Sequence, residues 1–415
     1  MRIHQLNLEK HRRYNKLSAM LGPFPLWFKS SPDLVLAGND ASPFICSALA
    51  PAMFLGEDIV VDRQYYVSAT LLENLQKIQT IMHAWNPIFK IINIQATTQS
   101  FKPSNKQLGH SVFFSGGVDG TYSLIQHLNQ LENLILINGF DFSMDKTTWR
   151  NMVARCQKTA HIFDKRLICV ESNLKEFTGW TRLARFANFG ASLASVALLL
   201  NPKSALCSAA VTYDAVHPSN GHPLIDPLWS SESCELSHVG LEADRAKKIA
   251  AIKHYPDALH NLWVCWKDPN CNCGRCAKCY RTHMAMQLND ITNFKFSEPI
   301  TTADLKQLSP KSEEDLSFYE YLYQLAMTKQ NKFLSRILKQ IIWRYRSKQF
   351  LRETDRLLLN ARWAKWRRSR LSINQLADVS VFPKYSDSIQ LDLLQQRLKK
   401  HPKFISSANI GSIYD

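Results

Sequence analysis

The chain of 415 residues lacks any apolar run long enough to cross a membrane. Its longest apolar stretch, around residues 191–200, falls well short of the about 18 residues that a membrane-spanning helix needs. Residues 1–16 are charged and contain histidine, so the apolar core of a secretion signal is missing too. We therefore expect a cytoplasmic protein with no membrane partner, in which all ten cysteines stay reduced.

The lysine-bearing loop GxxxxGK[ST] of many nucleotide-binding proteins is absent as well. In its place, a short glycine motif follows the apolar run Ser111–Phe114 and precedes a helical pattern of leucines and isoleucines. Glycines let the backbone approach an anion, and the start of the next helix adds positive partial charge. The motif predicts a phosphate cradle for ATP, and the alternative is an ordinary strand-to-helix turn. The expected ATP-binding residues are Ser115, Gly116, Gly117, Val118, Asp119, Gly120 and Thr121.

Four cysteines form a C-x7-C-x2-C-x2-C cluster, and Cys271 lies among them as a spare. Such spacing suits a tetrahedral metal ion, and a site closed by four thiolates leaves no position for a reacting water. We expect a structural zinc ion, with an iron–sulfur cluster or a disulfide pair as alternatives. The predicted metal ligands are Cys265, Cys273, Cys276 and Cys279.

The middle of the chain alternates between apolar strand-like runs and helical stretches, which predicts an α/β fold with a doubly wound parallel sheet. Ligands of such sheets bind beyond the carboxyl ends of the strands, where Asp141 and Glu171 are further candidates, each equally well explained as a helix cap or a solvated turn. The predicted strands are Ser111–Phe114, Leu134–Ile137, Leu167–Val170, Ala205–Ala209 and Glu235–His238.

The glycine motif resembles the PP-loop of the N-type ATP pyrophosphatases. Together with the later CGxCxxC segment, Cys273–Cys279, it is similar to 7-cyano-7-deazaguanine synthase-like proteins, and the resemblance covers residues from about 109 to 288. Gly120 is a departure, because relatives usually carry Ser or Thr there. The resemblance implies a PP-loop domain, here residues 104–295, that ends in a zinc knuckle.

The resemblance also implies an activity. A ligase of this type binds ATP and Mg²⁺, adenylates a carboxylate with release of pyrophosphate, and passes the acyl group to ammonia or an amine, forming an amide or a nitrile. Ser115 and Asp119 are the implied catalytic residues, with Asp119 organising phosphate or Mg²⁺. The implied partner is a small carboxylate, such as a deazapurine, or a protein terminus. A binding protein without turnover is a third possibility.

Candidate substrate chemistry lies in the polar segment 208–229. A histidine here can deprotonate an amine, and a carboxylate can accept from a ring N–H. The alternative is a structured loop whose side chains cap turns while Trp229 fills the core. Further on, we expect Arg245 and Lys248 to lie on the solvated face of an amphipathic helix, and the alternative is that one of them reaches a phosphate. The candidate substrate residues are Tyr213, Asp214, His217, His222 and Asp226.

The two ends of the chain are predicted as separate units. Residues 1–103 form an α/β unit with strands at Leu34–Gly38 and Ile59–Asp62 and a helix at Ala69–Trp85. Residues 296–415 form a basic helical region in which Lys329–Arg370 carries fourteen lysines and arginines against two carboxylates. Trp343, Tyr345, Trp363 and Trp366 lie among these cations.

The basic region has two interpretations. The cations and aromatic rings are compatible with nucleic acid, which favours an alternative function: a PP-loop modifier that adenylates a base carbonyl of tRNA or DNA. The recurrence of Leu334, Ile337, Leu338, Ile341 and Ile342 at helical spacing instead favours a helix packed on the core with an exposed basic face. A homodimer or an operon-partner protein is also possible.

Overall fold

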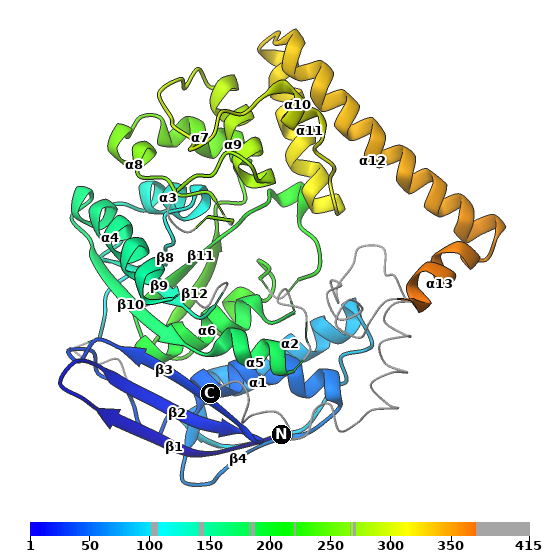
Figure 1. Ribbon diagram of the computed structural model, residues 1–415. Helices are drawn as coiled ribbons and strands as arrows, with labels where there is room; N and C mark the ends of the chain where they lie inside the picture. The colour runs from blue at the N-terminus through cyan, green and yellow to red at the C-terminus, as the bar shows by residue number, and fades with distance from the viewer. Residues whose placement is uncertain are drawn as a thin grey trace.

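The computed structural model describes residues 1–100, 107–140, 145–181, 183, 187–219, 221–265, 267–268 and 271–370 (Figure 1). A sheet of ten strands, in the order β12-β11-β8-β9-β10-β3-β2-β1-β4-β6, runs through the molecule. Asp141 and residues 371–415 lie outside the described residues.

Five parallel neighbours form one half of this sheet: β8 (Ser111–Phe113), β9 (Asn133–Asn138), β10 (Arg166–Ser172), β11 (Ser204–Ser208) and β12 (Glu235–Val239). All five strands predicted from apolar runs are therefore confirmed. β8 is the middle strand of this half. From β8 the chain adds β9 and β10 on one side, and then returns to add β11 and β12 on the other side. Because these strands are parallel, the carboxyl ends of β8, β9, β11 and β12 lie at one edge of the sheet.

Helices cover both faces of the sheet (Figure 1). One face carries α1 (Ser42–Leu55), α2 (Ala69–Trp85), α5 (Leu174–Trp180) and α6 (Phe189–Leu200), and the other carries α3 (Val118–Gln126), α4 (Lys146–Ile162), α7 (Arg245–Ile252), α8 (Pro256–His260) and α9 (Ala277–Leu288). A mostly parallel sheet with an apolar core on each face is compatible with the predicted doubly wound fold. The longest apolar run is explained by α6, which is buried all round between the sheet and α1. In the described part of the chain, no helix is long and apolar enough to span a membrane.

The N-terminal residues extend the same sheet. β1 (Arg2–Lys10), β2 (Asn15–Leu21) and β3 (Phe24–Ser30) are antiparallel, and β3 pairs with β10 across the sheet. β4 (Ile59–Val61) and β6 (Ile94–Gln95) complete it, while β5 (Tyr66–Ser68) and β7 (Thr97–Gln99) form a separate pair. The predicted strand near residue 59 and the helix Ala69–Trp85 are confirmed.

The expected strand at Leu34–Gly38 is wrong. This segment is irregular, because the side-chain amide of Asn15 donates to the carbonyl oxygens of Pro32 and Leu34, at 3.2 and 2.8 Å, where a neighbouring strand would otherwise pair. The apolar pattern there reports burial, since Leu34 and Leu36 point into the core. Alternating burial alone does not separate a strand from a packed loop.

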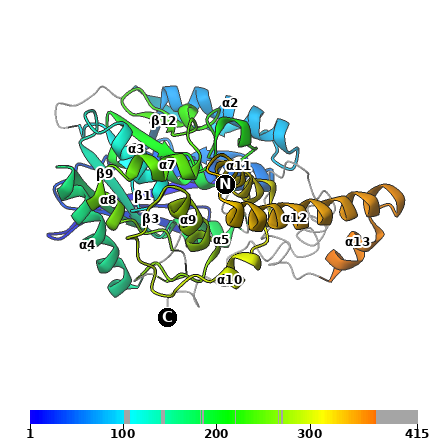
Figure 2. The same cartoon turned by 90° about the horizontal axis from the view of Figure 1, so that it is seen from above.

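The described part of the C-terminal region, up to residue 370, contains four helices, as expected for a helical region. It comprises α10 (Thr302–Lys306), α11 (Glu313–Thr328), α12 (Lys332–Leu358) and α13 (Arg362–Ser369). The stripe Leu334, Ile337, Leu338 and Ile341 is buried where α12 packs on α11, which supports its interpretation as core. Seen from above, α12 extends well beyond the sheet and α13 folds back from its end (Figure 2).

Candidate active site

The glycine motif forms the turn between β8 and α3. Gly116 adopts a left-handed conformation (φ +76°), and Gly117 is the N-cap of α3. A Cβ atom on Gly120 would lie 3.3 Å from the carbonyl oxygen of Phe113, so glycine suits the close approach of α3 to β8. Glycine at position 120 therefore has a packing reason.

Asp119, at the start of α3, faces two cations from α7. Its Oδ1 lies 3.2 Å from Lys248 Nζ and its Oδ2 lies 3.6 Å from Arg245 Nη1. Burial opposes ionisation of Asp119, but attraction to Lys248, Arg245 and Lys278 outweighs it and lowers the pKa of the carboxyl. Both carboxylate oxygens of Asp119 thus face cations, and this geometry fixes Lys248 and Arg245 beside the loop.

The expectation of a solvated basic face on α7 is wrong for these two residues. Lys248 is 1% exposed and also donates to the carbonyl oxygen of Ala209 at 2.6 Å, at the end of β11. The Arg245 side chain is 12% exposed, whereas Lys247 points to solvent. Because Asp119 lies 129 residues from Lys248 in sequence, periodicity along α7 does not reveal the pair.

A cavity of about 370 Å³ lies at the carboxyl ends of β8, β9, β11 and β12, as predicted for this fold. Ser115, Gly117, Val118, Asp119 and Gly120 line it; Gly116 and Thr121 are not among the described residues that do. An apolar wall includes Phe113, Ile137, Phe140, Met152 and Trp263, and a cationic side consists of Arg245, Lys278 and Arg281. The cavity thus combines a glycine turn, an apolar surface and clustered positive charge.

The cationic side has free hydrogen-bonding capacity. Arg245 donates to Thr282 Oγ1 at 3.2 Å, and Arg281 pairs with Asp315 at 2.5 Å. The Nε atoms of both arginines are nevertheless buried without a partner among the described residues. Burial lowers the pKa of Arg245, although guanidinium groups stay charged at neutral pH. An anion in the cavity would meet the positive charge of both guanidinium groups.

A second group of polar residues lines the far side of the cavity. Asp226 Oδ2 lies 2.6 Å from Nδ1 of His238, and its Oδ1 accepts from the backbone N–H of His222 at 3.2 Å. His222 Nδ1 accepts from the backbone N–H of Leu224 at 3.0 Å. Burial, with the nearby His238 and His217, lowers the pKa of His222 to about 4, so this ring is neutral at pH 7. Asp226 therefore orients His238, a residue that the sequence placed only in a strand.

The predicted substrate residues divide between two places. His217, His222 and Asp226 line the cavity, whereas Tyr213 is 69% exposed and lies outside it. Asp214 accepts from the hydroxyls of Thr212 and Tyr321, at 2.7 and 2.8 Å, and ties its loop to α11. Trp229 is fully buried in η3 (Asp226–Trp229). Glu171 is exposed on β10.

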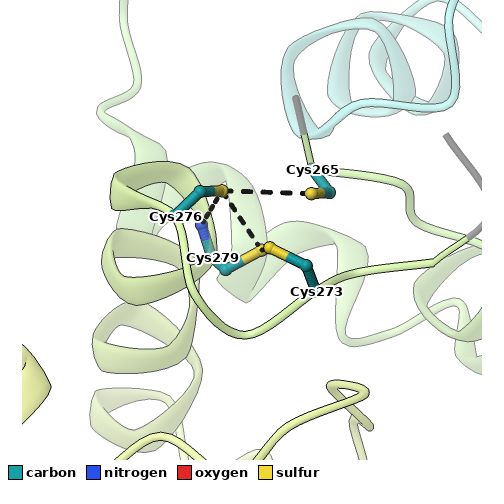
Figure 3. Close-up of side chains that lie close together, drawn as sticks. All are labelled: Cys265, Cys273, Cys276 and Cys279. Atoms are coloured by element: carbon teal, nitrogen blue, oxygen red, sulfur yellow. Dashed lines mark hydrogen bonds between the residues drawn. The ribbon is translucent and has the colours of Figure 1, made fainter. Parts of the chain in front are cut away.

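The four predicted metal ligands converge (Figure 3). The sulfurs of Cys265, Cys273, Cys276 and Cys279 all lie within 4.8 Å of one another, and the cluster is buried. The Sγ–Sγ distances include 3.4 Å for Cys276–Cys279 and 4.0 Å for Cys265–Cys276. A zinc ion with Zn–S bonds of about 2.3 Å requires tetrahedral edges of about 3.8 Å. The donor set and its dimensions therefore fit zinc.

The local backbone supports negative sulfur atoms. Backbone N–H groups of Lys267 and Asp268 donate to Cys265 Sγ, both at 3.3 Å, and that of Arg275 donates to Cys273 Sγ at 3.3 Å. Gly274 adopts φ +72°, and a Cβ atom there would lie 2.3 Å from the carbonyl oxygen of Glu298. The knuckle is thus shaped for thiolates and requires glycine at this turn.

The knuckle is connected to the cavity at two points. The backbone N–H of Trp263, two residues before Cys265, donates to the carbonyl oxygen of Gly116 at 2.8 Å. Cys276 is the N-cap of α9, whose first turns carry Lys278 and Arg281 into the cavity wall. A metal at the knuckle would hold the glycine turn and the cations in one geometry.

Replacement of Cys276 by serine should remove the metal. We expect the zinc content to be one ion per chain in the unaltered protein and nearly none in Cys276→Ser, because three thiolates and a hydroxyl bind zinc poorly. The variant should also unfold at a lower temperature. Elemental analysis and thermal unfolding measure both. Cys271→Ser is the control, since Cys271 lies outside the cluster. Full zinc content in Cys276→Ser would contradict the ligand set.

The neutral His222 predicts a pH dependence of stability. Its folded-state pKa of about 4 lies below the ordinary 6.5, so the unfolded chain binds the extra proton as the pH falls through 6.5. The free energy of unfolding should drop between about pH 6.5 and 4, by less than about 3 kcal/mol, and then level off. Urea unfolding at several pH values should show that the free energy of unfolding depends less on pH in His222→Gln than in the unaltered chain. The exposed His161→Gln should keep the pH dependence of the unaltered chain. Identical pH profiles of the His222 variant and the unaltered chain would contradict the assignment.

No protein-family model, curated protein or solved structure matches this chain. The resemblance to PP-loop proteins therefore rests on the residues of the glycine turn and the knuckle themselves.

Proposed function

We propose that the chain is an ATP-dependent enzyme that adenylates a carboxylate, releases pyrophosphate and passes the acyl group to ammonia or another amine. The observation that carries this proposal is the meeting, in one cavity, of the glycine turn, three cationic side chains and a histidine oriented by a carboxylate. The first two features suit a polyphosphate, and the third suits proton transfer.

The glycine turn and the cations both bind the phosphates of the nucleotide. Backbone N–H groups at the start of α3 face the phosphates, while Arg245, Lys278 and Arg281 neutralise their charge. The adenine ring lies against the apolar wall near Ile137 and Met152. A carboxylate oxygen of the second substrate attacks the α-phosphorus, the bond to the bridging oxygen breaks, and pyrophosphate leaves toward the cations.

His238 would act in the second half of the reaction. The amine nitrogen attacks the acyl carbon, AMP leaves, and the amine loses a proton. His238 is suited to take that proton, because donation from Nδ1 to Asp226 leaves Nε2 as the basic nitrogen. His222, neutral and buried beside Asp226, contributes polar contacts to the substrate without adding charge.

A second candidate uses the same chemistry on a nucleic acid, with adenylation of a base carbonyl in tRNA or DNA. The observation that favours it is the excess of cations between Lys329 and Arg370. The substrate, not the cavity, distinguishes the two candidates.

The decisive experiment follows the α-phosphate of labelled ATP with the purified chain. The reaction is run with 7-carboxy-7-deazaguanine and ammonium, with bulk tRNA, and with neither, and AMP is separated from ADP. AMP formation that depends on the small acid supports the first candidate, and dependence on tRNA supports the second. ADP as the nucleotide product would contradict both.

Lys278 provides a test that needs no known acid. We expect Lys278→Ala to weaken ATP or pyrophosphate binding by about ten- to a hundredfold, because a charge-assisted contact contributes about 1.5–3 kcal/mol. Isothermal titration calorimetry measures the affinity. Arg275→Ala is the matched control, since Arg275 is exposed on the same knuckle and pairs with Glu298. Unchanged affinity in Lys278→Ala would remove this residue from the nucleotide site.

A further inference from the structure

The far end of α12 and the short helix α13 expose large apolar side chains that the proposed reaction does not use. The exposed fractions are 81% for Leu357 and 77% for Leu358 at the end of α12, and 53% and 54% for Trp363 and Trp366 in α13. Phe350 and Leu351 lie about two helical turns earlier on α12 and are also mostly exposed. We name these six residues the hairpin tip.

The hairpin tip has a defined fold. Between the helices, Asn360 and Ala361 adopt left-handed conformations, with φ of 49° and 56°. The buried Asp355 accepts from the backbone N–H groups of Trp363 and Ala364, at 3.3 and 3.1 Å, and so caps the start of α13. The exposed leucines and tryptophans are therefore displayed on a fixed turn.

Positive charge surrounds the tip. Arg352 and Arg356 on α12 and Arg362, Lys365 and Arg367 on α13 are all exposed. Across residues 329–370, fourteen cationic side chains are opposed only by Glu353 and Asp355, and Asp355 is buried in the turn. The partner of this surface must offer both negative charge and an apolar phase.

We propose that the hairpin tip docks on the surface of a bilayer that contains anionic phospholipids. The basic side chains meet the headgroups, while the leucines and tryptophans enter the boundary with the acyl chains. This interaction lies parallel to the surface and needs no membrane-spanning segment, so it differs from the expectation of no membrane partner, which considered only spanning segments. It is independent of the proposed reaction on a small carboxylate, and it assigns to lipid the cations that favour the nucleic-acid candidate.

The aromatic geometry favours lipid over nucleic acid. The guanidinium of Arg370 lies 4.1 Å from the ring centroid of Trp366, and that of Arg367 lies 5.7 Å from the ring centroid of Trp363. These cations occupy ring faces on which bases would stack. Exposed leucines have no counterpart on a phosphate backbone, whereas acyl chains bury them.

Among the residues that the structure describes, the arrangement leaves the tip accessible. Both views show α12 leading away from the sheet, with α13 at its outer end (Figures 1 and 2). Contact with a flat surface at this end does not require the cavity beside α3 and α9 to approach the surface.

The test is sedimentation of the full chain with phosphatidylcholine vesicles that either contain or lack phosphatidylserine, at low and high salt. We expect binding to the anionic vesicles only, weakened by salt. The double variant Leu357→Asp with Leu358→Asp should bind about tenfold or more weakly. Phe333→Asp, an exposed position near the start of α12, is the matched control and should bind as the unaltered chain does.

Three results would overturn the proposal. One is that the chain sediments equally with vesicles that contain and that lack phosphatidylserine, or does not sediment with either. Another is RNA or DNA binding that displaces the vesicles and is unaffected by the two leucine substitutions, which would assign the surface to nucleic acid. The third is a change of mass in sedimentation velocity caused by the leucine variant, which would assign the tip to a contact between copies of the chain. ATP binding is measured in parallel, so failure of the nucleotide proposal is recognised separately.

Discussion

A partly buried carboxylate with two cations is the interaction on which the candidate site depends. Asp119 belongs to α3, Lys248 and Arg245 belong to α7, and Lys248 also reaches the end of β11 through the carbonyl of Ala209. Arg245 continues the connection to Thr282 on α9. Four elements are thus joined at one point, and loss of Asp119 would leave the buried Lys248 without a counter-charge, at a cost of about 3–5 kcal/mol.

The sequence predicts those features whose residues lie close together in the chain. Five parallel strands appear as short apolar runs because both faces of a central strand are buried. The knuckle is visible because its ligands are close together, and the glycine turn because only glycine tolerates its backbone. The CGxCxxC segment also contains Lys278 and ends two residues before Arg281, so their place in the cavity wall is a consequence of α9 beginning at Cys276.

Contacts between distant segments are what the sequence does not reveal. β3 joins the sheet through β10, and Asn173 accepts from the backbone N–H of Trp27 at 2.9 Å across the same junction. Trp85, from the N-terminal part of the chain, packs on His222 with ring centroids 4.8 Å apart. The pairing of His238 with Asp226 likewise depends on how β12 lies against η3. Each of these contacts is set by the assembled sheet and not by the spacing of residues.

The position of the knuckle has a thermodynamic consequence. Because α9 starts at a cysteine of the cluster that could hold a metal ion, and carries two cations of the cavity wall, the order of that helix would contribute both to metal retention and to anion binding. Two ligands that favour the same ordered state increase each other's affinity by the same factor. An anion in the cavity would therefore raise the affinity of the knuckle for a metal ion, and oxidation of a knuckle thiol would lower the affinity of the cavity for that anion.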